Sequence, residues 1–183
     1  AARPGDTVYV WPGTYYENVV VSKAICLRGH NRATTIVDGN GFGSIISITA
    51  SYAEVSNLSL TNSGGAMADV DVANADFVRI ANNDISESYF GISTTYSNYL
   101  HIEGCFIAPT TDIGIFLQVY CNSSEIHDNE IYTTHTGLSF YMSNDNLAHN
   151  NTISGATFYG VNIESSSGNV HRDNLISNNG YGV

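Results

Sequence analysis

The sequence predicts an all-β fold, a parallel β-helix of about eight coils of 22–24 residues each. Three observations predict it. A glycine-led phrase recurs at a fixed spacing, an Asn-x-Ile phrase recurs at nearly the same spacing, and apolar residues alternate as they do in strands. A fixed period of this size is typical of stacked repeats, in which each unit packs only on its neighbours.

The glycine-led phrase is Gly, an apolar residue, a variable residue and a second apolar or β-branched residue. It occupies residues 91–94, 114–117, 137–140 and 160–163 and begins again at 182, so its glycines lie 23, 23, 23 and 22 residues apart. The phrase is too short and too rich in Gly and Ser for a helix. We expect its apolar pairs to point inward and to stack: Ile46/Ile48, Val70/Val72, Ile92/Thr94, Ile115/Leu117, Leu138/Phe140 and Val161/Ile163.

The Asn-x-Ile phrase predicts a structural ladder of asparagines at one turn of successive coils. Its asparagines are Asn83, Asn129, Asn151 and Asn174, and Cys105 stands in the remaining copy. An asparagine at a bend can donate its side-chain amide to the next asparagine and so pair polar groups where the backbone ladder is interrupted.

The 183 residues fit one domain, with first coils and a cap over residues 1–44 and regular coils over residues 45–183. Because the sequence starts and stops within the repeat pattern, we expect it to be an excerpt of a longer chain. A hydrophobic content of 43% with only 13% charged residues excludes a disordered chain.

The net charge is −11, from 6 Lys and Arg against 17 Asp and Glu, which argues against nucleic acid as a partner. The acidic surface leaves room for Ca²⁺, and no other cofactor is expected. The chain has no apolar run long enough to span a membrane, so we expect no membrane insertion of this segment. Cys26, Cys105 and Cys121 are interpreted as small apolar residues, with a Cys105–Cys121 disulfide as the alternative.

The opening residues 5–19, Gly-Asp-Thr-Val-Tyr-Val-Trp-Pro-Gly-Thr-Tyr-Tyr-Glu-Asn-Val, resemble the first coil of the pectin-lyase-like superfamily, and residues 25–29 and 35–39 continue the match. The later repeats resemble NosD-type, carbohydrate-binding-and-hydrolase repeats of periplasmic and cell-surface proteins, archaeal ones included. The resemblance implies a right-handed, single-stranded helix. It implies no single activity, because the superfamily includes lyases, hydrolases, esterases, epimerases and segments with no known chemistry.

No catalytic residues are predicted. The Gly-x-Tyr-x-Glu phrase at 13–17 resembles pectin methylesterases, but the aspartate and arginine contexts that carry the chemistry of that family do not occur. On the outward face of the glycine-led strands, Asp71 and Glu164 lie four coils apart, roughly 19 Å at the strand spacing. A glycosidase pair needs its carboxyl groups within roughly 5 to 10 Å.

The same outward face carries a candidate carbohydrate-binding row. Phe116 and Tyr141 lie on adjacent coils, with Gln118, Asn162 and Glu164 near them. Aromatic rings can stack on the apolar C–H face of a sugar, while polar side chains bind its hydroxyl groups. The alternative is that these aromatics are present for strand propensity alone.

A candidate metal site comprises His127, Asp128 and His149, because the two histidines should stack on successive coils. A second column pairs Asp112 with His135. The alternative for both is a solvated turn.

Three sequons, at Asn57, Asn122 and Asn150, favour an extracellular location with N-glycosylation. Together with the resemblance they indicate the extracellular space or the cell surface, with the periplasm as the alternative.

The predicted function is an extracellular or cell-surface structural or assembly module. Its expected partners are polysaccharide or copies of itself stacked end to end through the open strand edges. One alternative is a polysaccharide lyase or glycoside hydrolase acting on acidic glycans. A second is a NosD-like periplasmic metal-accessory protein.

Overall fold

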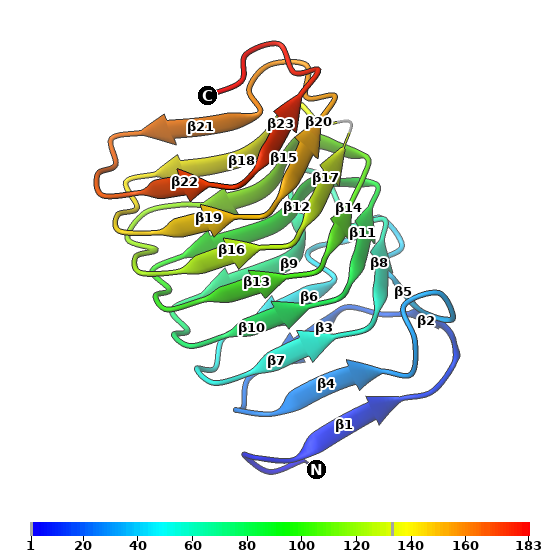
Figure 1. Ribbon diagram of the computed structural model, residues 1–183. Coiled ribbons are helices and arrows are strands. Elements are labelled where there is room, and N and C mark those ends of the chain that lie inside the picture. The colour runs from blue at the N-terminus through cyan, green and yellow to red at the C-terminus, as the bar shows by residue number, and fades with distance from the viewer. Residues whose placement is uncertain (1, 133) are drawn as a thin grey trace.

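The computed structural model describes residues 2–132 and 134–183, and these residues form strands and no helix (Figure 1). The strands make three parallel sheets, which we name A, B and C. Sheet A contains β1 (Thr7–Val10), β4 (Cys26–Gly29), β7 (Glu54–Ser56), β10 (Arg79–Ala81), β13 (His101–Glu103), β16 (Glu125–His127), β19 (Leu147–His149) and β22 (Val170–Arg172).

Sheet B contains β2 (Gly13–Tyr16), β5 (Thr35–Asp38), β8 (Ser59–Thr61), β11 (Asp84–Ser86), β14 (Phe106–Ile107), β17 (Glu130–Tyr132), β20 (Thr152–Ser154) and β23 (Leu175–Ser177). Sheet C contains β3 (Val19–Val21), β6 (Ile46–Ile48), β9 (Ala68–Ala73), β12 (Ser88–Thr95), β15 (Thr110–Leu117), β18 (Thr136–Tyr141) and β21 (Val161–Glu164). The Asn-x-Ile phrases belong to sheet B and the glycine-led phrases to sheet C.

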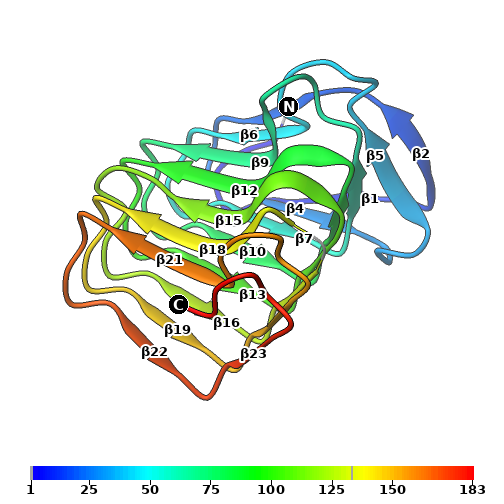
Figure 2. The same ribbon diagram turned by 90° about the horizontal axis from the view of Figure 1, so that it is seen from above.

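Each coil gives one strand to each sheet in the order A, B, C, and successive coils stack along one axis (Figures 1 and 2). There are seven complete coils, and β22 and β23 begin another, so the predicted parallel β-helix is confirmed. Residues 1–44, expected to hold first coils and a cap, contribute β1 to β5 to the same three sheets. The opening of the chain is therefore part of the stack.

The core is a set of apolar columns inside the coils. The glycine-led phrases pair residue for residue, so that Ile92 lies between Val70 and Ile115, and Leu138 lies between Ile115 and Val161. These side chains are buried, and Phe140 is the largest that is completely buried. Ile163 on the last complete coil is 39% exposed, because no further described strand of sheet C covers it.

The repeated glycines of sheet C have a steric explanation. A Cβ atom on Gly91 would lie 2.5 Å from the carbonyl oxygen of Gly114, and one on Gly114 would lie 2.7 Å from that of Gly137. The same holds for Gly137, at 2.6 Å from the oxygen of Gly160. Atoms at this separation overlap, so only glycine allows the coils to approach this closely.

Asp69 lies in the same column, opposite Gly91, because its neighbours Ala68 and Val70 pair with Phe90 and Ile92. Its side chain is fully buried, and within the described residues neither carboxylate oxygen has a hydrogen-bond partner. Burial raises the pKa of Asp69 to about 8, and the nearby hydroxyl groups of Ser63 and Ser88 offset this only in part. Asp69 is therefore a buried acid that holds its proton at neutral pH.

The asparagines form a hydrogen-bonded column at the turn between sheets A and B. The backbone N–H and side-chain amide of Asn129 both donate to Asn151 Oδ1, each at 3.0 Å, and Asn151 donates to Asn174 in the same way. Each amide also donates to a backbone carbonyl, as Asn151 does to Ile126. Cys105 interrupts the column, and its backbone N–H donates to Asn129 Oδ1.

Arg32 joins coils that are not neighbours. It lies in the turn between β4 and β5, its Nε is 3.2 Å from Asp84 Oδ1 on β11, and its Nη1 donates to the carbonyl of Gly104 after β13. The contact therefore runs from the second coil to the fourth and the fifth.

The cysteines are unbridged, with Cys105 and Cys121 buried and Cys26 half-buried. Within residues 2–132 and 134–183, no helix has the length and apolarity to cross a membrane.

Candidate functional site

The outward face of sheet C is the widest regular surface of the molecule, because β12 and β15 have 8 residues each whereas most strands have 3 or 4. Its central row is Asp71, Ser93, Phe116, Ser139 and Asn162, which pair in that order across neighbouring strands. Of the predicted carbohydrate-binding residues, Phe116 and Asn162 belong to this row, whereas Tyr141 pairs with Glu164 two residues farther along the strands and Gln118 directly follows β15.

A shallow hollow of about 180 Å³ lies over the first half of this face. It is lined by Ser44, Ala66, Met67, Ala68, Asp71, Phe90, Ser93, Thr95 and Gln118. The loop that carries Ala66 and Met67 joins sheet B to sheet C just before β9 and forms one wall. Of the central row, Asp71 and Ser93 line this hollow.

The side chains around the hollow are partly ordered by one another. Gln118 Nε2 donates to Ser93 Oγ at 2.8 Å, and the rings of Phe90 and Phe116 lie 5.6 Å apart at an angle of 49°. Farther along the row, Asn162 donates to Ser139 Oγ at 3.3 Å. The face therefore offers a half-buried aromatic pair beside hydroxyl and amide groups.

Asp71 is the only carboxylate among the residues that line this hollow. Burial raises its pKa above the usual range for an aspartate. Glu164 pairs with Tyr141 at the far end of the face, four coils from Asp71, and neither of these two lines the hollow. Phe116 and Gln118 thus lie at or beside the hollow, whereas Asn162, Tyr141 and Glu164 continue the surface away from it.

Two aromatic features were missed in the sequence. Phe90 is brought onto the face by a register irregularity between Ser88 and Phe90, which no periodicity reveals. Tyr52, Phe77 and Tyr99 stack in a nearly parallel column, with ring centroids 5.0 and 4.8 Å apart, at the turn that leads from sheet C to sheet A. Their spacings of 25 and 22 residues match the coil period, which is the signal that could have found them.

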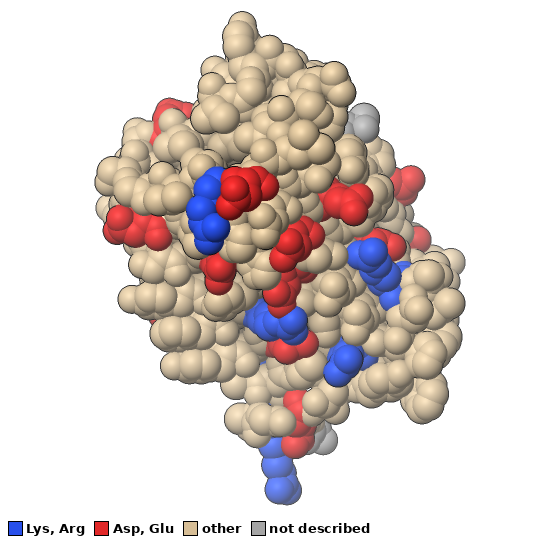
Figure 3. Space-filling view, viewed as in Figure 1, with Lys and Arg blue, Asp and Glu red and all other residues tan. Residues whose placement is uncertain are grey.

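Charged side chains gather instead on the outward face of sheet A, which Figure 3 shows as a band of acidic and basic groups in contact. Arg79 Nη1 is 3.0 Å from Glu54 Oε1, and Arg79 also pairs with Glu103. Glu103 Oε2 lies in turn 3.2 Å from His127 Nε2. Acidic and basic side chains therefore alternate from coil to coil along sheet A.

The predicted metal residues lie at the C-terminal half of this band. The rings of His127 and His149 stack 5.0 Å apart at an angle of 6°, so the structure brings the two histidines together. Asp128 Oδ2 is 2.7 Å from His127 Nδ1, whereas His149 Nε2 is 2.9 Å from Glu125 Oε1. The three residues do not turn their ligand atoms to one common point.

The two residues of the second predicted column lie next to each other, and the sequon asparagines differ in exposure. Asp112 Oδ1 lies 3.4 Å from His135 Nδ1 at the start of the sheet C strands. Of the sequon asparagines, Asn57 and Asn122 are half-buried and Asn150 is exposed. The side-chain amide of Asn122 donates to Asn98 Oδ1 at 3.1 Å, so a glycan on that nitrogen would compete with this bond.

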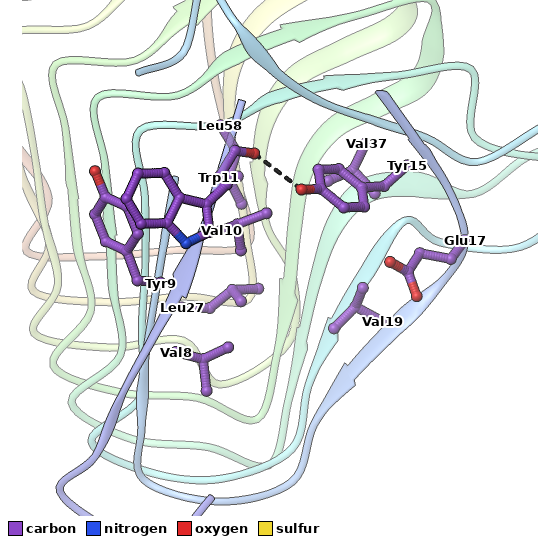
Figure 4. A pocket seen from close by; sticks show the side chains of 10 residues that line it. All are labelled: Val8, Tyr9, Val10, Trp11, Tyr15, Glu17, Val19, Leu27, Val37 and Leu58. Carbon is purple, nitrogen blue, oxygen red and sulfur yellow. Dashed lines mark hydrogen bonds between the residues drawn. The ribbon is translucent and has the colours of Figure 1, made fainter. Parts of the chain in front are cut away.

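A larger hollow, of about 340 Å³, lies at the first coil (Figure 4). Val8, Val10, Val19, Leu27, Val37 and Leu58 form its apolar floor, and Tyr15 donates its hydroxyl group to the carbonyl of Trp11 at 3.0 Å. Trp11 is 67% exposed. The first coil therefore covers this end of the apolar core only in part.

Comparison with known proteins gives matches of two kinds. A family described as "Right handed beta helix region" matches residues 43–183. No curated protein sequence matches the chain.

Among solved structures, the A-module of mannuronan C-5 epimerase AlgE4 from Azotobacter vinelandii has a TM-score of 0.68 at 15% identity, covering 97% of this chain and 64% of that one. A pectin methylesterase in complex with a hexasaccharide has a TM-score of 0.65 at 12% identity, covering 90% and 58%. An alginate lyase from Paenibacillus sp. str. FPU-7 has a TM-score of 0.57 at 13% identity, covering 100% and 92%. At these identities the likeness shows a shared fold, and the chain spans less than two thirds of the first two proteins.

Proposed function

Because the chain belongs to the family of right-handed β-helix regions, we propose that it is a polysaccharide-binding module whose binding surface is the outward face of sheet C. The observation that carries the proposal is the pair of Phe90 and Phe116 beside the bonded Ser93 and Gln118, along an open hollow. The fold likeness to an epimerase, a lyase and a methylesterase named for polysaccharide substrates supports it as an analogy of fold alone.

The chemistry of the face suits a sugar chain. A sugar ring has apolar C–H faces and a polar rim, so half-buried aromatics and neighbouring hydroxyl and amide groups satisfy both. At about 180 Å³ the hollow is smaller than ligand pockets of about 300–1,000 Å³. This size suits one unit of an extended chain that continues along the face toward Asn162, which is half-buried, past the buried Ser139.

The charge of the face selects among glycans. Among the described residues that line the hollow there is one carboxylate, Asp71, and no Lys or Arg, and the net charge of the chain is −11. A uronate polymer would be repelled unless cations intervene, and salt would screen that repulsion. The proposed ligand is therefore an uncharged polysaccharide, with retention on uronate polymers weaker at low salt.

Affinity electrophoresis in gels that contain neutral or uronate polysaccharides tests the proposal. Replacing both Phe116 and Gln118 by alanine should weaken retention about tenfold, which corresponds to about 1.4 kcal/mol, on the scale of one lost aromatic contact. Phe106→Ala is the matched control, because Phe106 is a partly exposed aromatic on sheet B. Unchanged retention of the double variant, or an equal loss in Phe106→Ala, would refute the site.

The alternative is a polysaccharide lyase or hydrolase, favoured by the raised pKa of Asp71 in the hollow. A lyase would convert uronate polymers, with or without Ca²⁺, into unsaturated ends that absorb ultraviolet light. A rise in absorbance that is lost in Asp71→Asn would replace the binding module by an enzyme. No rise, from protein shown to be folded by circular dichroism, would leave the binding module as the better proposal.

A further inference from the structure

A cluster of imidazoles and carboxylates on sheet A is unused by the proposed sugar surface. Its residues come from the strands β13 and β16, on which His101 pairs with Glu125 and Glu103 pairs with His127. The middle residues of these strands, Ile102 and Ile126, are buried, so the flanking side chains point outward. The cluster thus spans two successive coils.

Three of these side chains offer ligand atoms to a common point. His101, Glu125 and His127 each present one donor atom, and the three atoms lie within 4.8 Å of one another. Glu125 Oε2 is 3.5 Å from His101 Nδ1. Donors around a tetrahedral Zn²⁺ lie about 3.3 Å apart, given bonds of about 2.0–2.1 Å. The His101 side chain is 54% exposed, so a change of its rotamer can close the remaining gap of up to about 1.5 Å.

Both ring nitrogens of His127 lie next to carboxylate groups. Asp128 accepts a hydrogen bond from His127 Nδ1 at 2.7 Å, so that nitrogen carries a hydrogen. The other nitrogen, Nε2, faces Glu103 Oε2 at 3.2 Å. The ring thus has a carboxylate on each side, and a carboxylate behind the imidazole, here Asp128, is the usual support of a metal-bound histidine.

His149 supports the cluster from the next coil. Its ring lies against that of His127, and its Nε2 donates to Glu125 Oε1 at 2.9 Å, which leaves Glu125 Oε2 turned toward His101. Hydrogen bonds of this kind, from a neighbouring group to a ligating carboxylate, fix the orientation of metal ligands. His149 and Asp128, predicted from the sequence as ligands, each contact one member of this cluster, Glu125 and His127 respectively.

We propose that His101, Glu125 and His127 bind a divalent transition-metal ion of the Zn²⁺ class on the outward face of sheet A, with Asp128 and His149 as positioning residues. Two imidazoles and one carboxylate form a ligand set suited to Zn²⁺ or Cu²⁺, whereas Ca²⁺ and Mg²⁺ prefer oxygen ligands alone. Glu103 or water takes the fourth position. The ion joins the fifth coil to the sixth.

Calorimetric titration of the untagged, chelator-treated chain with Zn²⁺ tests the proposal. One saturable site is expected. Asp128→Asn should weaken binding roughly 10–100-fold, as loss of a positioning carboxylate does, and His101→Ala and Glu125→Gln should weaken it at least as much. His135→Ala is the matched control, because its side chain is 49% exposed and it also lies beside a carboxylate, Asp112. This variant should bind Zn²⁺ as the unaltered chain does.

A second measurement keeps the test independent of folding defects. Electron paramagnetic resonance with Cu²⁺ should show coupling to two imidazole nitrogens, reduced to one in His101→Ala. Absence of saturable Zn²⁺ binding, an equal loss in His135→Ala, or Ca²⁺ binding in place of Zn²⁺ would overturn the site. Because Asp71 and Phe116 lie on sheet C and Gln118 directly follows its strand β15, failure of this test leaves glycan retention unaffected, and the two proposals are judged separately.

Discussion

Replacing Asp69 by asparagine should change how stability depends on pH. Asp69 is fully buried between coils, and its carboxyl oxygens have no hydrogen-bond partner among the described residues. Asparagine has nearly the same shape and does not ionise. The substitution therefore removes a titrating group while leaving the packing of the coils almost unchanged.

The magnitude follows from the two pKa values of the carboxyl group. Burial raises the pKa of Asp69 to about 8 in the folded chain, against about 3.9 for an unfolded aspartate. Between these values the unfolded chain has released the proton and the folded chain retains it. The contribution of the Asp69 carboxyl group to the free energy of unfolding is thus complete below about pH 4. It is lost as pH rises toward 8, at up to about 1.4 kcal/mol per pH unit. From pH 5 to pH 7 the loss is about 3 kcal/mol.

Denaturant unfolding at pH 5, 6 and 7, followed by circular dichroism, measures this effect. The free energy of unfolding of Asp69→Asn, relative to the unaltered chain, should increase by about 3 kcal/mol from pH 5 to pH 7. Asp173→Asn controls for the loss of one negative charge, because Asp173 is exposed on the last coil. Parallel pH profiles for Asp69→Asn and the unaltered chain would refute the reasoning, since they would mean that the carboxyl group ionises freely inside the fold.

Three further substitutions test the coil contacts by the same unfolding measurement. Gly137→Ala should destabilise by about 1–3 kcal/mol, because its Cβ would meet the carbonyl of Gly160; an unchanged midpoint would mean that the coils can separate at no energetic expense. Asn151→Ala should lower stability by about 3 kcal/mol or more, since it leaves several buried groups unpaired, the amide of Asn129 among them. A loss below about 1 kcal/mol would count against the asparagine column. Phe140→Ala should remove about 3–5 kcal/mol, and a smaller loss would indicate that the core collapses around the gap.

The repeat of the strands could be predicted from the sequence because each coil repeats its apolar pattern. Ile92, Ile115 and Leu138 occupy the same place in successive phrases, and parallel pairing places them in one column. The outward row through Phe116 follows from the same register. Strand periodicity therefore determined most of the fold and the direction of the row.

The hollow and the metal cluster could not be predicted in the same way. Phe90 reaches its position through a register irregularity, and the loop at Met67 has no counterpart in the repeat. Asp69 alternates with apolar residues as an outward side chain would, yet within β9 it is completely buried. His101 pairs with Glu125, and His127 pairs with Glu103, so the coil period alone does not bring the two imidazoles together.

Arg32 gives the stack a property that nearest-neighbour packing lacks. In a solenoid each repeat contacts only the adjacent ones, so coils can detach one at a time from an end. Because Arg32 reaches from the second coil to Asp84 and Gly104 on the fourth and fifth, peeling away the second coil under a pulling force must first break contacts two and three coils away. In a single-molecule stretching experiment, these four coils should yield as one block with a single rupture, and Arg32→Ala should divide that rupture into smaller steps.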